Sequence, residues 1–135
     1  MTYDQLNIGD SAFFEKTISE SDVYSFAGII GDFNPAHINK TYAENSRFGH
    51  RIAHGMLSGS LFSTVIGMKL PGEGTIYLGQ SLEFKTPVYF GDTIKATVKV
   101  AEKLEKGRVK LECAATNQDG IIVISGEALV LPPRQ

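Results

Sequence analysis

The sequence predicts an α+β fold in which a curved antiparallel sheet covers one central, buried helix. The first observation is that the stretch Ile52–Met68 contains no Asp, Glu, Lys or Arg, and a helix that is apolar or small all round is typical of one buried all round. The second is that the chain after residue 75 alternates between apolar and polar side chains in segments separated by turn residues, which is typical of an antiparallel meander. Because 135 residues suffice for one core, we expect a single domain, 1–135.

The first half of the chain predicts a strand followed by helices. A strand is expected over Ser11–Thr17, and a helix is expected to begin at Ser19 as its N-cap and to end at Gly31. A short helix is expected over Lys40–Ser46, and the central helix over Gly55–Met68. Apolar residues at helical spacing support the first of these helices: Val23, Phe26, Ala27 and Ile30.

The second half predicts about four long strands. The first is expected over Thr75–Phe84, with Ile76, Leu78, Leu82 and Phe84 sharing one face. Turns are expected at Gly91-Asp92, Lys106-Gly107 and Asp119-Gly120, and Pro132-Pro133 ends the pattern. An open sheet of this kind has unpaired edges, so we expect a homodimer that protects them. The other three strands are predicted from these alternating residues: Ile94, Ala96, Val98 and Val100; Val109, Leu111, Cys113 and Ala115; Ile122, Ile124, Ala128 and Val130.

Composition excludes several classes of function. The net charge is −2, with an isoelectric point near 5.9 and no basic stripe, which argues against nucleic acid as a partner. Small and polar residues interrupt the longest uncharged stretch, so no membrane span is expected. Met1–Gln5 lack the basic and apolar segments of a signal peptide, so we expect a cytoplasmic protein. Cys113 is the only cysteine and is expected to be a buried packing residue.

Two short motifs carry the candidate chemistry. The segment Asp32-Phe33-Asn34-Pro35-Ala36-His37 places a carboxylate and an imidazole close together in the chain. Proline breaks helix locally, so we expect Asp32 and His37 to project from a stiff bend, with the Asn34 side chain fixing the turn. The segment His54-Gly55-Met56 opens the predicted central helix. Together the motifs offer an acid/base pair and a helix start able to polarise an oxygen.

These motifs, with Leu61-Phe62-Ser63 and Tyr77-Leu78-Gly79-Gln80-Ser81, resemble the MaoC-like (R)-specific enoyl-CoA hydratases over nearly the whole chain. The resemblance implies a hot-dog fold, a homodimer, and reversible hydration of trans-2-enoyl-CoA to (R)-3-hydroxyacyl-CoA without a cofactor. It implies catalytic roles for Asp32 and His37. It also implies substrate contacts for Ser63, near the middle of the central helix, and for the Gly55 N–H, which would polarise the thioester carbonyl.

The residues themselves are suited to this reaction. Hydration needs an activated water at C3, a proton for C2, and donors for an enolate-like oxygen. A carboxylate and an imidazole can hold and deprotonate one water, and the Gly55 N–H can serve the oxygen. No metal is required. We expect the acyl tail to lie along the central helix, with Ile66 near Ser63 and Leu131 of the last strand as pocket walls.

The sequence also allows other interpretations. Asp32, His37 and His54 could form a two-histidine, one-carboxylate metal site, or His54 could be purely structural. The substrate could be carried by an acyl-carrier protein, with dehydration as the reaction. A hot-dog acyl-CoA thioesterase or a non-catalytic acyl-thioester binding module would share the fold. His50 is expected to be a solvated loop residue. Gln80 is expected either to satisfy backbone groups around the central helix or to line the tunnel.

Overall fold

A single six-stranded antiparallel sheet organises the chain. The computed structural model describes all 135 residues. The strand order is β1-β4-β5-β6-β2, with β3 also paired to β6. The strands are β1 (Ser11–Thr17), β2 (Ile76–Gln80), β3 (Glu83–Phe84), β4 (Thr93–Lys103), β5 (Val109–Thr116) and β6 (Ile122–Leu131). The helices are α1 (Glu20–Ile30), α2 (Pro35–Ile38), α3 (Lys40–Glu44), α4 (Gly55–Gly59) and α5 (Leu61–Met68), with a 3₁₀ turn at Glu105–Gly107.

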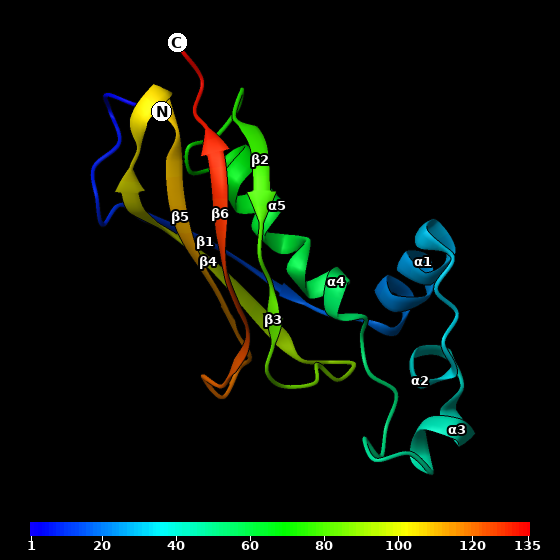
Figure 1. Ribbon diagram of the computed structural model, residues 1–135. Coiled ribbons are helices and arrows are strands. Elements are labelled where there is room, and N and C mark those ends of the chain that lie inside the picture. Colours follow the sequence, from blue (N-terminus) through cyan, green and yellow to red (C-terminus); the bar gives the residue numbers. More distant parts are fainter.

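The curved sheet covers α4 and α5, whereas α1, α2 and α3 gather beside this layer (Figure 1). The predicted α+β arrangement is therefore confirmed, and it is the arrangement that the hot-dog resemblance implies. None of the helices has the length and apolar character needed to cross a membrane.

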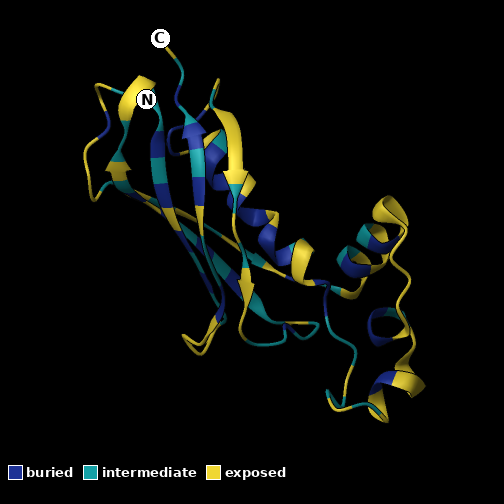
Figure 2. Cartoon of the chain, in the orientation of Figure 1, coloured by how far each residue is buried: buried dark blue, intermediate teal, exposed yellow.

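The core lies between the sheet and α5. The alternation predicted for β4 and β5 is confirmed, because all of its apolar residues from Ile94 to Val100 and from Val109 to Ala115 are fully buried. Phe62, Val65 and Ile66 of α5 belong to the same buried cluster as these strand residues. Figure 2 shows buried segments both in α5 and in the middle strands of the sheet. Cys113 is buried among them, and burial raises the pKa of its thiol to about 11.

The helix α1 forms as its caps predict. The Ser19 hydroxyl accepts a hydrogen bond from the Asp22 backbone N–H, and the Asp22 carboxylate accepts one from the Ser19 backbone N–H, so both halves of a capping box are present. Gly31 ends the helix in the left-handed conformation, with φ of 79°. The chain is thus turned sharply just before Asp32.

The segment after Gly31 differs from the predicted bend. Pro35 begins the short helix α2 instead of breaking one, and His37 lies on this helix. The physical reason is that proline at the first helical position loses no hydrogen bond and already has the required φ. Asn34 caps the helix, its side-chain oxygen accepting from the Ala36 N–H at 3.0 Å, so its predicted turn-fixing role is confirmed.

The predicted central helix is divided in two at Ser60. Its hydroxyl donates to the Leu57 carbonyl at 2.5 Å, and serine groups that bond back to the preceding turn disturb the regular helical ladder. The expectation of burial on all sides is also wrong for this chain. Met56 and Met68 are 56% and 66% exposed, so one face of α4 and α5 is open.

The predicted strand Thr75–Phe84 is likewise divided, into β2 and β3. The Ser81 carbonyl lies directly over Gly126, where any Cβ would collide with it, so the chain leaves regular pairing there. The expected apolar face is largely exposed: Ile76, Leu78 and Phe84 are each about half exposed, because β2 is an edge strand.

The alternation predicted for the last strand fails at its start. Ile122 is half exposed and Val123 is buried instead. The register slips between Ala115 and Thr116 of β5, which pair with Ile124 and Ile122. Val123 is therefore the extra residue of a bulge, which shifts the alternation by one.

Candidate active site

Three side chains from two distant segments meet beside α1. Asp32 and His37 come from the segment around α2, and His54 immediately precedes α4. The Asp32 carboxylate accepts a hydrogen bond from the Asn34 backbone N–H at 3.1 Å, which holds it in a local turn. The Asp32 side chain is 47% exposed, whereas those of His37 and His54 are 11% and 3% exposed. The cluster is therefore open to solvent only on its carboxylate side.

The distances within this cluster define its chemistry. One Asp32 carboxylate oxygen, Oδ2, lies 4.0 Å from Nε2 of His37 and 4.0 Å from Nε2 of His54. The His37 Nδ1 lies 2.7 Å from the Ile52 carbonyl oxygen, which can only accept. His37 therefore carries its proton on Nδ1 when neutral and presents an unprotonated Nε2 toward Asp32.

The environment of His37 favours this neutral form. Desolvation by burial lowers the pKa of His37 from its ordinary value of 6.5, and His54 acts in the same direction. The bond to the Ile52 carbonyl and the nearby Asp32 carboxylate oppose the shift, and they do not overcome it. His37 is thus suited to accept a proton near neutral pH.

The same three residues were candidates for a metal site, and their ligand atoms lie within 4.8 Å of one another. The His54 Nε2, however, lies 2.9 Å from the Asp32 backbone carbonyl oxygen, so it carries a proton and donates to that oxygen. This takes the His54 Nε2 out of a shared ligand set and leaves the His37 Nε2 and the Asp32 carboxylate facing each other, fewer than the three protein ligands typical of a catalytic zinc. The other nitrogen of His54, Nδ1, is buried without a partner. The arrangement favours acid–base chemistry.

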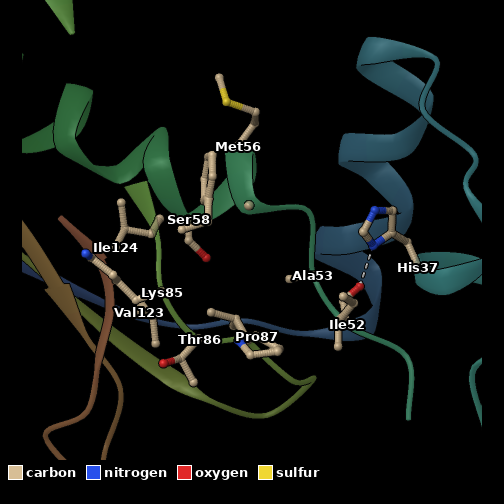
Figure 3. A pocket seen from close by; sticks show the side chains of 13 residues that line it. His37, Ile52, Ala53, Met56, Ser58, Lys85, Thr86, Pro87, Val123 and Ile124 are labelled. Carbon is tan, nitrogen blue, oxygen red and sulfur yellow. Dashed lines mark hydrogen bonds between the residues drawn. The ribbon is translucent and has the colours of Figure 1, made fainter. Parts of the chain in front are cut away.

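A cavity of about 350 Å³ adjoins His37. Gly55 and Ser58 of α4 line it, together with the segment Phe84–Val88 and two residues of β6, Val123 and Ile124. The Ser58 hydroxyl points away from its helix toward Thr86 and Pro87 (Figure 3). This hydroxyl is fully buried and has no hydrogen-bond partner. A buried polar group of this kind is costly unless a ligand or water satisfies it.

Ser58 was not among the site residues expected from the sequence. The available signal was its spacing, because Ser58 follows Gly55 by three residues and so lies on the same helix face. A serine at that distance is common for many reasons, and only the tertiary fold shows that this face borders the cavity of His37.

Gly55 lies where it was expected, at the first position of α4 and at the cavity of His37. Its N–H precedes the first intrahelical hydrogen bond and is not used by the helix. Gly55 also has a packing reason to be glycine, since an added Cβ would lie 2.6 Å from the Phe84 ring.

Ser63 is placed elsewhere. It is exposed on α5 and lines a second cavity, of about 390 Å³. Met56 lines both cavities, so the two are neighbours. Gln80 also lines the second cavity, and its side chain bonds to the Tyr77 hydroxyl and the Ser81 carbonyl. Gln80 therefore lines a cavity, and the backbone group that it satisfies lies between β2 and β3 and not around the central helix.

The two expected acyl-pocket residues do not line the cavity of His37. Ile66 is 2% exposed and is packed in the core between α5 and the sheet. Leu131 borders a different hollow, beside Pro132 and Pro133. His50 is exposed and lies against Tyr89, apart from the cluster.

Comparisons of the sequence with known proteins identify the family of this chain. Residues 7–120 match the family model described as "MaoC like domain". The chain is 47% identical over 131 residues to an (R)-specific enoyl-CoA hydratase of Rhodospirillum rubrum, covering 97% of this chain and 91% of that one. It is 42% identical over 134 residues to a 3-hydroxybutyryl-CoA dehydratase of Methylorubrum extorquens, covering 98% and 85%.

A solved structure gives the same result. The unliganded R-hydratase PhaJ1 of Pseudomonas aeruginosa superimposes with a TM-score of 0.95 at 46% identity, over 99% of this chain and 86% of that one. Because the family model matches most of the chain and relatives of high identity match nearly all of it, the chain belongs to the MaoC-like family.

Proposed function

We propose that this protein is a hydro-lyase that reversibly hydrates trans-2-enoyl-CoA to (R)-3-hydroxyacyl-CoA. One observation carries the proposal: the Asp32 carboxylate and the unprotonated Nε2 of His37 lie 4.0 Å apart, and His37 lines a cavity. One water, about 2.8 Å from each acceptor, fits between them. The similar proteins named as a hydratase and as a dehydratase describe the two directions of this one reaction.

In this mechanism the water oxygen bonds to C3 while Asp32 and His37 accept its hydrogen bonds. One water proton passes to this pair, and the pair returns a proton to C2, so that H and OH are added across the double bond. The electron pair of the double bond first moves toward the thioester oxygen, which becomes enolate-like. The Gly55 N–H is proposed to donate to that oxygen, where a preorganised donor is most effective.

Two serines are proposed to contact the substrate, Ser58 and Ser63. Ser58 contacts the substrate or its water from the cavity wall, because its buried hydroxyl otherwise has no partner. Ser63 contacts the substrate from the neighbouring cavity. The acid–base pair and the Gly55 N–H supply all the required chemistry, so no cofactor is proposed. A CoA thioester substrate agrees with the cytoplasmic location expected from the sequence.

We also propose a homodimer. The edge strand β2 and the neighbouring β3 expose a row of apolar side chains, which includes Ile76, Leu78 and Phe84, and Met56 is exposed on α4. A long apolar edge of this kind invites pairing with a second copy. Light scattering on the purified protein tests this: a dimer is expected, and a monomer at micromolar concentration with full activity would contradict it.

The direct test of the activity is the absorbance of the conjugated enoyl thioester. Adding the protein to crotonyl-CoA should lower this absorbance without release of free CoA. Release of free thiol would instead indicate a thioesterase, and binding without either change would indicate a non-catalytic module. Parallel assays with crotonyl groups on CoA and on acyl-carrier protein test the proposed carrier, which is CoA.

A further inference from the structure

His54 contacts three residues of the candidate site and its surroundings: Asp32, His37 and Phe26. Its Nε2–H donates to the Asp32 backbone carbonyl at 2.9 Å. Its ring is stacked on the His37 ring, with centroids 3.8 Å apart and planes inclined by 27°. The His54 ring also makes an edge contact with Phe26 of α1, with ring centroids 5.2 Å apart. His54 therefore touches both members of the acid–base pair and the helix that precedes them.

The contact with Asp32 reaches across the chain. Asp32 lies in a short exposed segment between α1 and α2, and its carboxylate is held locally by the Asn34 N–H. That bond belongs to the same turn, so it cannot fix the turn relative to the rest of the protein. The bond from His54 joins residues 22 positions apart and ties the Asp32 backbone to the start of α4.

The contact with His37 acts on the ring itself. The His37 ring is fixed at one edge by the Ile52 carbonyl, at 2.7 Å from Nδ1. A single hydrogen bond allows the ring to tilt, whereas a stacked neighbour on one face limits that motion. With both constraints in place, the His37 Nε2 points toward the Asp32 carboxylate.

We propose that His54 is a positioning residue that holds Asp32 and His37 at the separation needed to share one water. It acts through its Nε2–H on the Asp32 carbonyl and through its ring face on His37, and it takes no part in bond making. This inference rests on the proposed hydration, and it concerns how the pair is held.

Three substitutions of His54 separate the hydrogen bond to Asp32 from the ring contact with His37. His54→Phe keeps a ring and removes the donor. His54→Gln and His54→Asn both remove the ring, but only the glutamine is long enough to place an N–H near the position of Nε2. His50→Gln is the matched control, because His50 is exposed and lies apart from the cluster. Circular dichroism checks the fold of each variant.

The expected result is a fall in kcat with little change in KM. His54→Phe should lower kcat on crotonyl-CoA by about 10- to 100-fold, the cost of misplacing catalytic groups by a fraction of an ångström to an ångström. His54→Gln should retain a kcat at least several-fold above that of His54→Asn. In an Asp32→Asn background, His54→Phe should lower kcat by clearly less than it does in the wild type, because the pair that it positions acts as a unit and has already lost one member.

The kinetic results that would overturn the role of His54 differ from those that would overturn the proposed hydration. A kcat within twofold of wild type for His54→Phe would overturn the inference. So would a double variant, His54→Phe with Asp32→Asn, whose kcat falls by the full product of the two single effects. If His54→Phe does not fold, the comparison of His54→Gln with His54→Asn decides, and equal kcat values would overturn it. Inactive wild-type protein and inactive His50→Gln would instead count against the proposed hydration.

Discussion

The Asp32 Oδ2 and the His37 Nε2 lie 4.0 Å apart, too far for a hydrogen bond and suited to one bridging water. Local turns and two hydrogen bonds from the segment before α4 hold the two groups: the Ile52 carbonyl bonds to His37, and His54 bonds to the Asp32 carbonyl. Gly31 turns the chain at the end of α1, Asn34 and Pro35 start α2, and the Ile52 carbonyl fixes the protonated side of the imidazole.

The first prediction concerns this pair. Asp32→Asn and His37→Gln should each fold normally and lower kcat by about 10²- to 10⁴-fold, because each replaces a group that can take up the water proton with an amide that cannot. Steady-state hydration of crotonyl-CoA, with circular dichroism as the folding check, measures this. Near-wild-type kcat in either folded variant would refute the assignment.

The second prediction follows from the lowered pKa of His37. Burial favours the neutral ring in the folded protein, so below about pH 6.5 the unfolded chain binds a proton that the folded chain does not. The free energy of unfolding should therefore decrease as the pH falls from 6.5 toward the folded-state pKa. Urea unfolding between pH 5 and 7.5 measures the slope, and His37→Gln should flatten it. An equal slope in both proteins would exclude His37 as its source.

The third prediction concerns the unpartnered hydroxyl of Ser58. Ser58→Ala should leave the free energy of unfolding unchanged or raise it, since a buried unsatisfied polar group costs about 1–3 kcal/mol. The same variant should weaken hydration, because the hydroxyl is proposed to contact substrate or water. Ser11→Ala is the control, as Ser11 is exposed at the start of β1 and lines neither cavity. Lower stability of Ser58→Ala with unchanged hydration would reverse this account.

The fourth prediction distinguishes two courses for the acyl chain. Ile124 and Ile66 are both 2% exposed and belong to the same core, but only Ile124 also lines the cavity of His37. If the chain fills the cavity, Ile124→Ala should raise kcat/KM for an eight-carbon relative to a four-carbon enoyl-CoA. One or two methylenes of discrimination are worth about 1–3 kcal/mol.

Ile66→Ala is the comparison for this experiment. It should chiefly lower the free energy of unfolding, by about 2–5 kcal/mol. A change of chain-length preference in Ile66→Ala alone would show that the acyl chain runs along α5, as first expected from the sequence.

The sequence predicted the fold class and the order of elements because local signals agreed with the global arrangement. The cap at Ser19, the glycine at Gly31 and the alternation along β4 and β5 each act within a few residues, so they can be read without knowledge of the fold. The bulge at Val123 depends on how β5 pairs with β6, which periodicity does not reveal. The division of the central helix at Ser60 is local, but the hydroxyl bond that accompanies it does not follow from hydrophobic spacing.

The residues of the candidate site could likewise be predicted only where the signal is local in the chain. Asp32 and His37 were predictable because their motif is contiguous in the chain. Ser58 and the contacts of His54 were not, because a buried hydroxyl without a partner and a stacked pair of imidazoles exist only after distant segments meet.

Hydration of crotonyl-CoA in deuterated water tests the central claim most directly. If Asp32 and His37 share one water as proposed, that water should deliver the hydroxyl to C3 and the pair should return deuterium to C2 on the same face of the double bond. The account predicts syn addition and an (R)-3-hydroxybutyryl-CoA product. Anti addition would contradict the one-water mechanism, and an (S) product would contradict the proposed function.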